Sequence, residues 1–305
     1  MILKDRILAL AIVIAWGVNF VVIKVGLEGM PPLLLAGLRF ALVAFPAVFF
    51  ISRPRIPIKL LFIYGLTISF GQFALLFWAL KAGLPAGLAS LILQAQAFFT
   101  LIFSAVILKE KIRAISWIAL IVAALGITLL ASAQDHGSAP VTIFTLLLTL
   151  GAASSWALGN ITNKFITRYD GVNSMSLIVW GAIAPACMFI VSSYVFEGGA
   201  EIINNVAMLQ WHNMFAIVYL SLLATLLGYG GWSYLLSRYP TSSVAPLSLL
   251  VPVFGLMAGY VFLGEQLNIT QVLGVIVVVA GLCLNFFGPV LVKKRQNSVS
   301  PAEIS

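Results

Sequence analysis

The sequence predicts an all-α polytopic membrane protein, with ten transmembrane helices arranged as two inverted five-helix repeats and both termini in the cytoplasm. Three observations predict this class. Hydrophobic residues make up 62% of the 305 residues and charged residues only 9%, with a mean hydropathy of +1.10. The apolar residues fall into ten runs of membrane-spanning length, and the two halves share residues at matching positions. No soluble core needs this much apolar material.

Each apolar run is long enough to cross about 30 Å of hydrocarbon. The first run follows Lys4 and Arg6, and no small-residue cleavage pattern ends it, so we expect a retained span rather than a signal peptide. The polar tail, residues 290–305, is expected to be a disordered cytoplasmic segment. The expected spans are Ile7–Ile23, Leu33–Ile51, Leu60–Leu80, Ala86–Leu108, Ile115–Ala131, Val141–Ile161, Ser174–Val195, Met214–Leu236, Ser243–Leu263 and Thr270–Phe287.

The distribution of basic residues orients the spans, because cytoplasmic loops carry an excess of Lys and Arg. With the N-terminus in the cytoplasm, the outer loops contain only Lys24 and Lys81, and Arg39 lies within a span. The net charge of +8 therefore reflects topology and does not indicate a nucleic-acid partner. The inner segments hold the other basic residues: Lys4, Arg6, Arg53, Arg55, Lys59, Lys109, Lys111, Arg113, Lys164, Arg168, Arg238, Lys293, Lys294 and Arg295.

An internal repeat is visible when the two halves are compared. Ten spans divide into two sets of five, and because five is odd, duplicated halves must be inverted relative to each other. The expected repeats are residues 4–133 and 140–289. "LKEK" (108–111) and "LGEQ" (263–266) close corresponding spans. At the same offset Pro85 matches Pro240, Tyr64 matches Tyr219 and Gly126 matches Gly281, while Trp16 precedes Lys24 as Trp156 precedes Lys164.

Arg39 is the main candidate for substrate binding. A guanidinium stays charged at any ordinary pH, and inside a membrane it usually faces a polar pathway. The helical rise places Asn19, Gln72, Gln94 and Gln96 at similar depths in the first repeat, so we interpret this layer as a polar substrate chamber. Two alternatives remain open. Arg39 can act as a structural clamp on backbone carbonyls, and each amide can serve as interhelical glue.

The second repeat is expected to pack against the rest of the substrate. Its equivalents of Gln72, Gln94 and Gln96 are the apolar Leu227, Leu249 and Val251. An Arg39 guanidinium can hold a carboxylate, and an ammonium needs amide oxygens or aromatic faces. This set suits a zwitterion, although another small anion also fits. The further candidate contacts are Trp78, Trp180, Tyr229, Trp232 and Ser248.

Small residues and prolines mark candidate hinges and helix contacts. Rocking hinges and simple close packing explain them equally well. Gly255 and Gly259 form a helix-contact seam that can belong to a gate, with homodimerisation as the weaker interpretation. The other positions in this group are Gly228, Gly230, Gly231, Pro246 and Pro252.

No chemistry beyond transport is indicated. All nine carboxylates and both histidines fall at span ends, in loops or in the tail, so facilitated export or exchange is favoured over proton antiport. No metal-ligand spacing, P-loop or nucleophile elbow occurs, so no metal, cofactor or enzymatic activity is expected. The alternatives are a carrier for another metabolite or a drug-like compound, and, from other classes, a membrane enzyme or a receptor subunit.

Several segments resemble the EamA family of drug/metabolite transporters. They are "AWGVNFVVIK", "MPPLLLAGLRF", "YGLTISFGQFALLF", "PAGLASLILQAQAFFT", "LKEK" and "APLSLLVPVFGL". The resemblance runs from about residue 4 to residue 288. It implies a ten-helix fold of two inverted repeats in the bacterial inner membrane that exports amino-acid metabolites, with O-acetylserine and cysteine as the expected substrates. The implied partners are the small-molecule substrate and the lipid bilayer.

Overall fold

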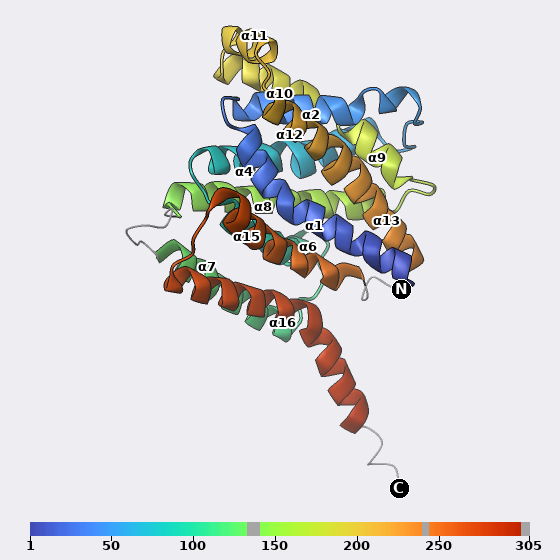
Figure 1. The fold of residues 1–305 in the computed structure, drawn as a ribbon. Helices are drawn as coiled ribbons and strands as arrows, with labels where there is room; N and C mark the ends of the chain where they lie inside the picture. Colours follow the sequence, from blue (N-terminus) through green and yellow to red (C-terminus); the bar gives the residue numbers. More distant parts are fainter. Residues whose placement is uncertain (133–140, 240–243, 300–305) are drawn as a thin grey trace.

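The computed structural model describes residues 1–132, 141–239 and 244–299, and within these ranges every regular element is a helix (Figure 1). Nine helices in the described part of the chain are long and apolar enough to cross a membrane, and a shorter apolar helix, Leu247–Leu263, corresponds to the ninth expected span. The expected start of that span, Ser243, lies outside the described residues. Ten membrane crossings therefore remain a prediction.

Five helices of the first half correspond to its five expected spans. They are α1 (Leu3–Gly26); α2 (Pro32–Ala44) with η1 (Ala47–Phe49); α3 (Ile58–Tyr64), η2 (Gly65–Gly71) and α4 (Gln72–Lys81); α5 (Ala86–Ile92), η3 (Leu93–Ala95) and α6 (Gln96–Ile107); and α7 (Ala114–Ser132). The second half contains α8 (Ile143–Ile166); α9 (Ser174–Gly181) and α10 (Ile183–Phe196); α11 (Gly199–Ala207); α12 (Trp211–Val218), η4 (Tyr219–Leu227) and α13 (Gly228–Arg238); η5 (Ala245–Leu249) and α15 (Leu250–Leu263); and α16 (Ile269–Val299).

Departures from α-helical geometry occur at matching places in the two halves. The third and eighth expected spans each contain a π-helical stretch, η2 and η4, and the fourth and ninth each contain a 3-10 stretch, η3 and η5. Such stretches release backbone carbonyls, which the membrane tolerates only where they are buried in protein or line a cavity. The indole of Trp16 uses one of them, since its Nε1 donates to Ala224 O at 2.9 Å.

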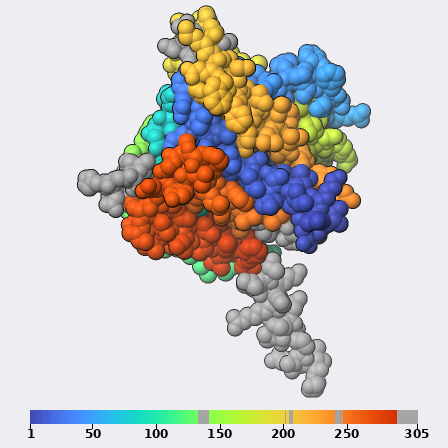
Figure 2. Space-filling view, in the orientation of Figure 1, coloured from blue at the N-terminus to red at the C-terminus, as the bar shows by residue number. Residues whose placement is uncertain are grey.

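The packing brings distant segments together around α1 and α8. Helix α1 contacts α15, α12, η4 and α13, while α8 contacts η2, α4 and α6 (Figure 1). Figure 2 shows the surfaces of α1 and α15 adjoining on one face of the molecule. Helices α2 and α10 pack against each other, and α7 and α16 form a separate pair at one edge. A large apolar core spans both halves.

Two elements differ from the sequence-based expectation. Helix α16 continues to Val299, so residues 290–299 are helical where a disordered tail is expected, and residues 300–305 lie outside the described residues. Extending an existing helix needs no new nucleus, and Lys, Arg and Gln favour the helical conformation. The long outer loop contains the amphipathic helix α11 (Gly199–Ala207), which is too short for its periodicity to stand out in the sequence.

The glycine positions are close contacts between helices. A Cβ built on Gly255 would overlap Ser90 Oγ. A Cβ built on Gly17 of α1 would lie 2.9 Å from Gly255 N, so helices of the same chain already occupy this helix-contact seam. In α13, a Cβ on Gly228 would lie 2.6 Å from Trp16 Nε1. Gly230 faces Met175 and Gly231 faces Ile12 in the same way. Pro252 is buried in α15, and Pro246 lies in η5.

Candidate functional site

A cavity of about 430 Å³ lies between the two halves and is the centre of the candidate site. At one end its wall includes buried residues, among them Phe20, Arg39 and Ser90. At the other end it reaches Ser174 and Leu236, which are exposed and lie where α9 begins and α13 nears its end. The cavity therefore opens on the side where α1 begins, which the basic residues predict to be cytoplasmic.

Arg39 supplies a charge to this cavity. Its side chain is 2% exposed, and its guanidinium carbon lies 4.1 Å from the centre of the Phe73 ring. Nη2 donates to Thr225 Oγ1 at 2.9 Å, whereas Nε and Nη1 have no hydrogen-bond partner. The two ion pairs between described residues do not involve Arg39. A guanidinium binds a carboxylate through two parallel N–H groups, either Nε with Nη2 or Nη1 with Nη2. Thr225 uses one of the two N–H groups of Nη2, so the other can pair with Nε or Nη1 to hold an anion.

Two buried amides from neighbouring helices also line the cavity. Asn19 of α1 is 8% exposed and Gln72 of α4 is 2% exposed. Asn19 Oδ1 and Gln72 Oε1 have no hydrogen-bond partner. Both α1 and α2 contact α4, so these oxygens and Arg39 belong to one set of packed helices. The cavity thus combines a cationic donor with unpaired acceptors.

Gln94, Gln96 and Ser248 line the cavity as well, and here the structure adds a residue that sequence reasoning missed. Asn160 of α8 donates through Nδ2 to Gln96 Oε1 at 3.0 Å and to Thr100 Oγ1 at 3.2 Å. Gln94 Nε2 donates to the Ser248 carbonyl at 3.5 Å. The signal for Asn160 was available, because it is the one amide within the expected span Val141–Ile161.

Aromatic side chains form another part of the wall. Trp16 lies 5.4 Å from Tyr229 and 5.1 Å from Trp232, measured between ring centres, and all three line the cavity. Of these, Tyr229 and Trp232 are sequence candidates, whereas Trp16 was noted only as a repeat match. This cluster offers apolar surface and π faces to a substrate.

Trp78 and Trp180 lie outside the cavity. Trp78 is 42% exposed on α4 and belongs to a shallow surface groove. Trp180 donates through Nε1 to Ile51 O at 2.8 Å, which ties the segment after η1 to α9. The sequence identified both by residue type and approximate depth, which do not determine the face of the helix.

The cavity can bind a small polar molecule. No Asp, Glu or His is among its lining residues in the described part of the chain. The same part of the chain contains no group of three or more His, Cys, Asp or Glu that could hold a metal. The arrangement is therefore one of recognition: a buried cation, amide groups and aromatic faces around an open space.

Comparison with known proteins gives concordant findings. A model of the EamA-like transporter family matches residues 5–132 and 143–287. A Salmonella typhimurium protein named "Probable amino-acid metabolite efflux pump" is 51% identical over 286 residues, 93% of this chain and 95% of that protein. An Escherichia coli protein of the same name is 48% identical over the same shares. A crystal structure at 19% identity covers 96% of this chain and 98% of its own, with a TM-score of 0.65, which shows a shared fold.

Proposed function

We propose that this chain, which belongs to the EamA-like transporter family, exports amino-acid metabolites by alternating access, with O-acetylserine and cysteine as its substrates. The chain is a multi-pass transporter of the inner membrane. The printed names of the Salmonella and Escherichia coli relatives supply the general substrate class. The specific substrates come from the sequence resemblance.

One observation carries the proposal: Arg39 is buried at the cavity with two donors unpaired. A charged side chain in the middle of a membrane costs about 3 kcal/mol on insertion scales, and a buried donor without a partner adds about 1–3 kcal/mol. A purely structural arginine would recover this cost through its neighbours. Here Thr225 accepts from one N–H group of Nη2 and the Phe73 ring covers the cation, which leaves Nε or Nη1, together with the second N–H group of Nη2, for a ligand carboxylate.

Alternating access is supported by the shape of the cavity and by the repeat. The cavity opens on the side where α1 begins, and this conformation is inward-facing if that side is cytoplasmic. The irregular stretches η2 and η4, and likewise η3 and η5, fall at matching positions of the two halves. Irregular helices in corresponding places of two repeats are typical of carriers whose repeats move around a central site.

The cavity lining supports a proposal for the energy source. A proton-coupled carrier usually keeps an acid or an imidazole in its pathway. Among the described residues the cavity lining offers neither. We therefore propose facilitated export or exchange driven by the substrate gradient.

A second candidate function is a carrier of larger aromatic or drug-like compounds, and the cluster of Trp16, Tyr229 and Trp232 favours it. Aromatic walls give affinity to many apolar molecules without strict selection. This candidate predicts that transport survives the loss of Arg39, whereas the amino-acid proposal predicts that it does not.

Counterflow in proteoliposomes tests the proposal. Vesicles are loaded with unlabelled O-acetylserine or cysteine, and the entry of the labelled compound is recorded without an imposed proton gradient. The Arg39→Met variant should lower flux at least about thirtyfold, because truncating one partner of a buried charge pair costs 2 kcal/mol or more. Arg55→Met, which removes an exposed loop cation, should transport like wild type.

The structural-clamp alternative has its own signature. Thr225→Val removes the hydrogen-bond partner of Arg39 and keeps the side-chain shape. If Arg39 is only a clamp, Thr225→Val and Arg39→Met should both lower the melting temperature and reduce flux in proportion. A folded Arg39→Met protein with wild-type flux would refute the carboxylate contact. Flux of other metabolites without O-acetylserine or cysteine would refute the named substrates.

A further inference from the structure

The strongest unexplained feature of the cavity is its pair of unpaired acceptors. Buried side-chain oxygens in folded proteins nearly always have a hydrogen-bond partner, because burying one without a partner is unfavourable. Asn19 and Gln72 line the cavity, and their buried oxygens, Oδ1 and Oε1, have none. They come from α1 and α4, which pack against each other. These two unpaired acceptors line the same cavity as Arg39, which has unpaired donors. Together they indicate a ligand that carries both an anionic group and hydrogen-bond donors.

We propose that Asn19 Oδ1 and Gln72 Oε1 accept hydrogen bonds from the primary ammonium group of the substrate while Arg39 holds its carboxylate. This inference rests on the proposed function and deepens it. The substrate class becomes free α-amino acids, and N-acylated amino acids are excluded. An ammonium carries three donors and no acceptor, so it can serve both oxygens and still donate to a third group.

The charge pattern of the site supports neutral acceptors for this ammonium. No carboxylate lines the cavity in the described part of the chain. A carboxylate beside Arg39 would neutralise the guanidinium and compete with the substrate for it. Amide oxygens avoid this conflict, because they accept from the ammonium without pairing with Arg39 as an ion. The two recognition tasks of a zwitterion can therefore be performed in one cavity.

Two isomers give a test that needs no mutation. O-acetylserine and N-acetylserine have the same atoms and the same carboxylate, but only O-acetylserine has a free ammonium. Counterflow at mildly acidic pH should favour O-acetylserine at least about tenfold, because N-acetylserine leaves one acceptor or both unpaired. Equal flux of both isomers would overturn the ammonium contact and leave the exporter function intact. No flux of either isomer, nor of cysteine, would contradict the proposed function itself.

Variants of the two amide residues test which side chains cause the preference for O-acetylserine over N-acetylserine. Gln72→Met and Asn19→Leu remove an acceptor with little change in volume, and each should bring the flux ratio of the two isomers towards one. Gln271→Met is the matched control, since Gln271 is a buried glutamine of α16 outside the cavity. It should leave the ratio unchanged even if it lowers stability. An unchanged ratio in both cavity variants would refute the assignment, because water or other groups would then serve the ammonium.

A separate observation concerns the closed end of the cavity. The carboxylate of Glu265 follows α15 and joins three segments there. Oε1 accepts from Lys24 Nζ at 2.9 Å and from Ala86 N at 2.6 Å, and Oε2 accepts from Gly87 N at 2.9 Å. The Glu265 side chain is 12% exposed. One carboxylate thus fastens the end of α1 and the start of α5 to the end of α15.

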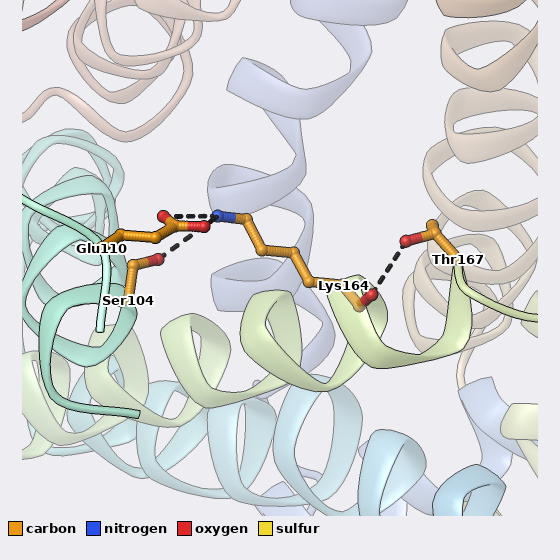
Figure 3. Close-up of polar contacts among 4 residues, drawn as sticks. All are labelled: Ser104, Glu110, Lys164 and Thr167. Carbon is orange, nitrogen blue, oxygen red and sulfur yellow. Dashed lines mark hydrogen bonds and ion pairs between the residues drawn. The ribbon is translucent and has the colours of Figure 1, made fainter. Parts of the chain in front are cut away.

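A second lysine–glutamate ion pair lies at the opposite end of the cavity and is more exposed than the first. Lys164 Nζ lies 3.0 and 3.2 Å from the carboxylate oxygens of Glu110 and 3.4 Å from Ser104 Oγ (Figure 3). Figure 3 also shows Thr167, whose hydroxyl donates to the carbonyl of Lys164. The side chains of Lys164 and Glu110 are 47% and 53% exposed. This pair is therefore open to solvent where its counterpart is closed.

The backbone shows that the two pairs are equivalents. Glu110 N donates to Ser104 O at 3.2 Å, and Glu265 N donates to Gly259 O at 3.1 Å. The residue before each glutamate has a positive φ, 58° at Lys109 and 64° at Gly264. Each glutamate thus leaves its helix through the same turn. We infer that the two lysine–glutamate pairs are alternating gates. In this inward-facing conformation the Glu265 pair is the engaged gate, because its carboxylate also binds two backbone amides of α5, whereas the Glu110 pair is formed but exposed.

Hydrogen–deuterium exchange of α5 tests the engaged gate in the full-length protein in nanodiscs. Glu265→Gln should speed exchange of the α5 amides at least about tenfold, because it removes charge-assisted hydrogen bonds at Ala86 and Gly87. Glu110→Gln should leave α5 exchange unchanged or slower. Glu28→Gln, an exposed carboxylate at the same end of the molecule, is the control for lost charge.

Two results would overturn the gate assignment. The first is unchanged α5 exchange in a folded Glu265→Gln protein, and the second is an equal increase in Glu110→Gln. If Glu265→Gln does not fold, Lys24→Met provides the same comparison, since it keeps the carboxylate and its two backbone donors. Lys24→Met should speed α5 amide exchange, but by less than loss of the Glu265 carboxylate would. Unchanged α5 exchange in Lys24→Met would again refute the gate assignment.

Discussion

Replacing Gly259 by alanine should open the closed end of the cavity. A Cβ built at Gly259 would overlap Glu265 Oε2 and would lie 3.2 Å from its Cδ and 3.3 Å from Gly87 N. The carboxylate must therefore shift, and the contact it is best placed to lose is the one with Gly87 N, now 2.9 Å long. Gly151→Ala on α8, where a Cβ would meet only Leu75 Cδ1 at 3.1 Å, is the matched control.

The size of the effect follows from the bond that is lost. A hydrogen bond to a charged group contributes about 1.5–3 kcal/mol. If the outward-facing state does not contain this bond, its loss shifts the equilibrium towards that state by about ten- to a hundredfold. The change is thus large enough to alter the fraction of molecules that open outward, and small enough to leave a folded protein.

The assay measures that fraction through a thiol. Val251→Cys places a cysteine of similar size on the cavity wall, in a background where Cys187 and Cys283 are changed to serine. In right-side-out vesicles, a membrane-impermeant maleimide reaches this thiol only while the cavity opens outward. Gly259→Ala should raise the labelling rate about ten- to a hundredfold, and Gly151→Ala should not. An unchanged rate in a folded Gly259→Ala protein would refute the reasoning.

Three further results are expected. Trp16→Phe leaves the Ala224 carbonyl without its indole donor and should lower the free energy of unfolding by about 1–3 kcal/mol, measured by thermal denaturation in detergent. Glu197→Ala removes the carboxylate that accepts from Leu33 N at 2.8 Å and Leu34 N at 3.1 Å at the start of α2, and should cost about 1–2 kcal/mol in the same assay. Counterflow of O-acetylserine should be unchanged by a protonophore, since no acid or imidazole lines the cavity among the described residues; inhibition would indicate proton coupling.

Much of the helix arrangement could be predicted from the sequence because the membrane imposes a length on each apolar run. The expected span Ile115–Ala131 lies within α7 (Ala114–Ser132), and Met214–Leu236 lies within the helix Trp211–Arg238. The π-helical and 3-10 stretches could not be predicted, since each depends on which carbonyls find partners across the fold. Ala224 O is one example, because its donor, Trp16, comes from another repeat.

The sequence predicted the polar residues that line the cavity better than it predicted the helix face on which an aromatic residue lies. Arg39, Asn19 and Gln72 line the cavity because polar groups at mid-membrane depth have few other places to go. Trp78 was selected by the same argument, yet it is 42% exposed on the outer surface of the bundle, because a tryptophan tolerates lipid. The sequence did not mark Asn160, because at the offset that relates Trp16 to Trp156 its counterpart in the first half is the apolar Phe20.

The two expected repeats differ in a way that the proposed mechanism explains. At the ends of the cavity they keep the same parts: Lys24 and Lys164, Glu265 and Glu110, and the left-handed residue before each glutamate. In the middle they do not, and Leu227, the equivalent of Gln72, is 63% exposed and absent from the cavity lining. An alternating carrier must close either end by equivalent movements, so its gates benefit from symmetry. A zwitterion has two different ends, so the site that binds it does not need to be symmetric. The residues in the middle of the two halves can therefore differ.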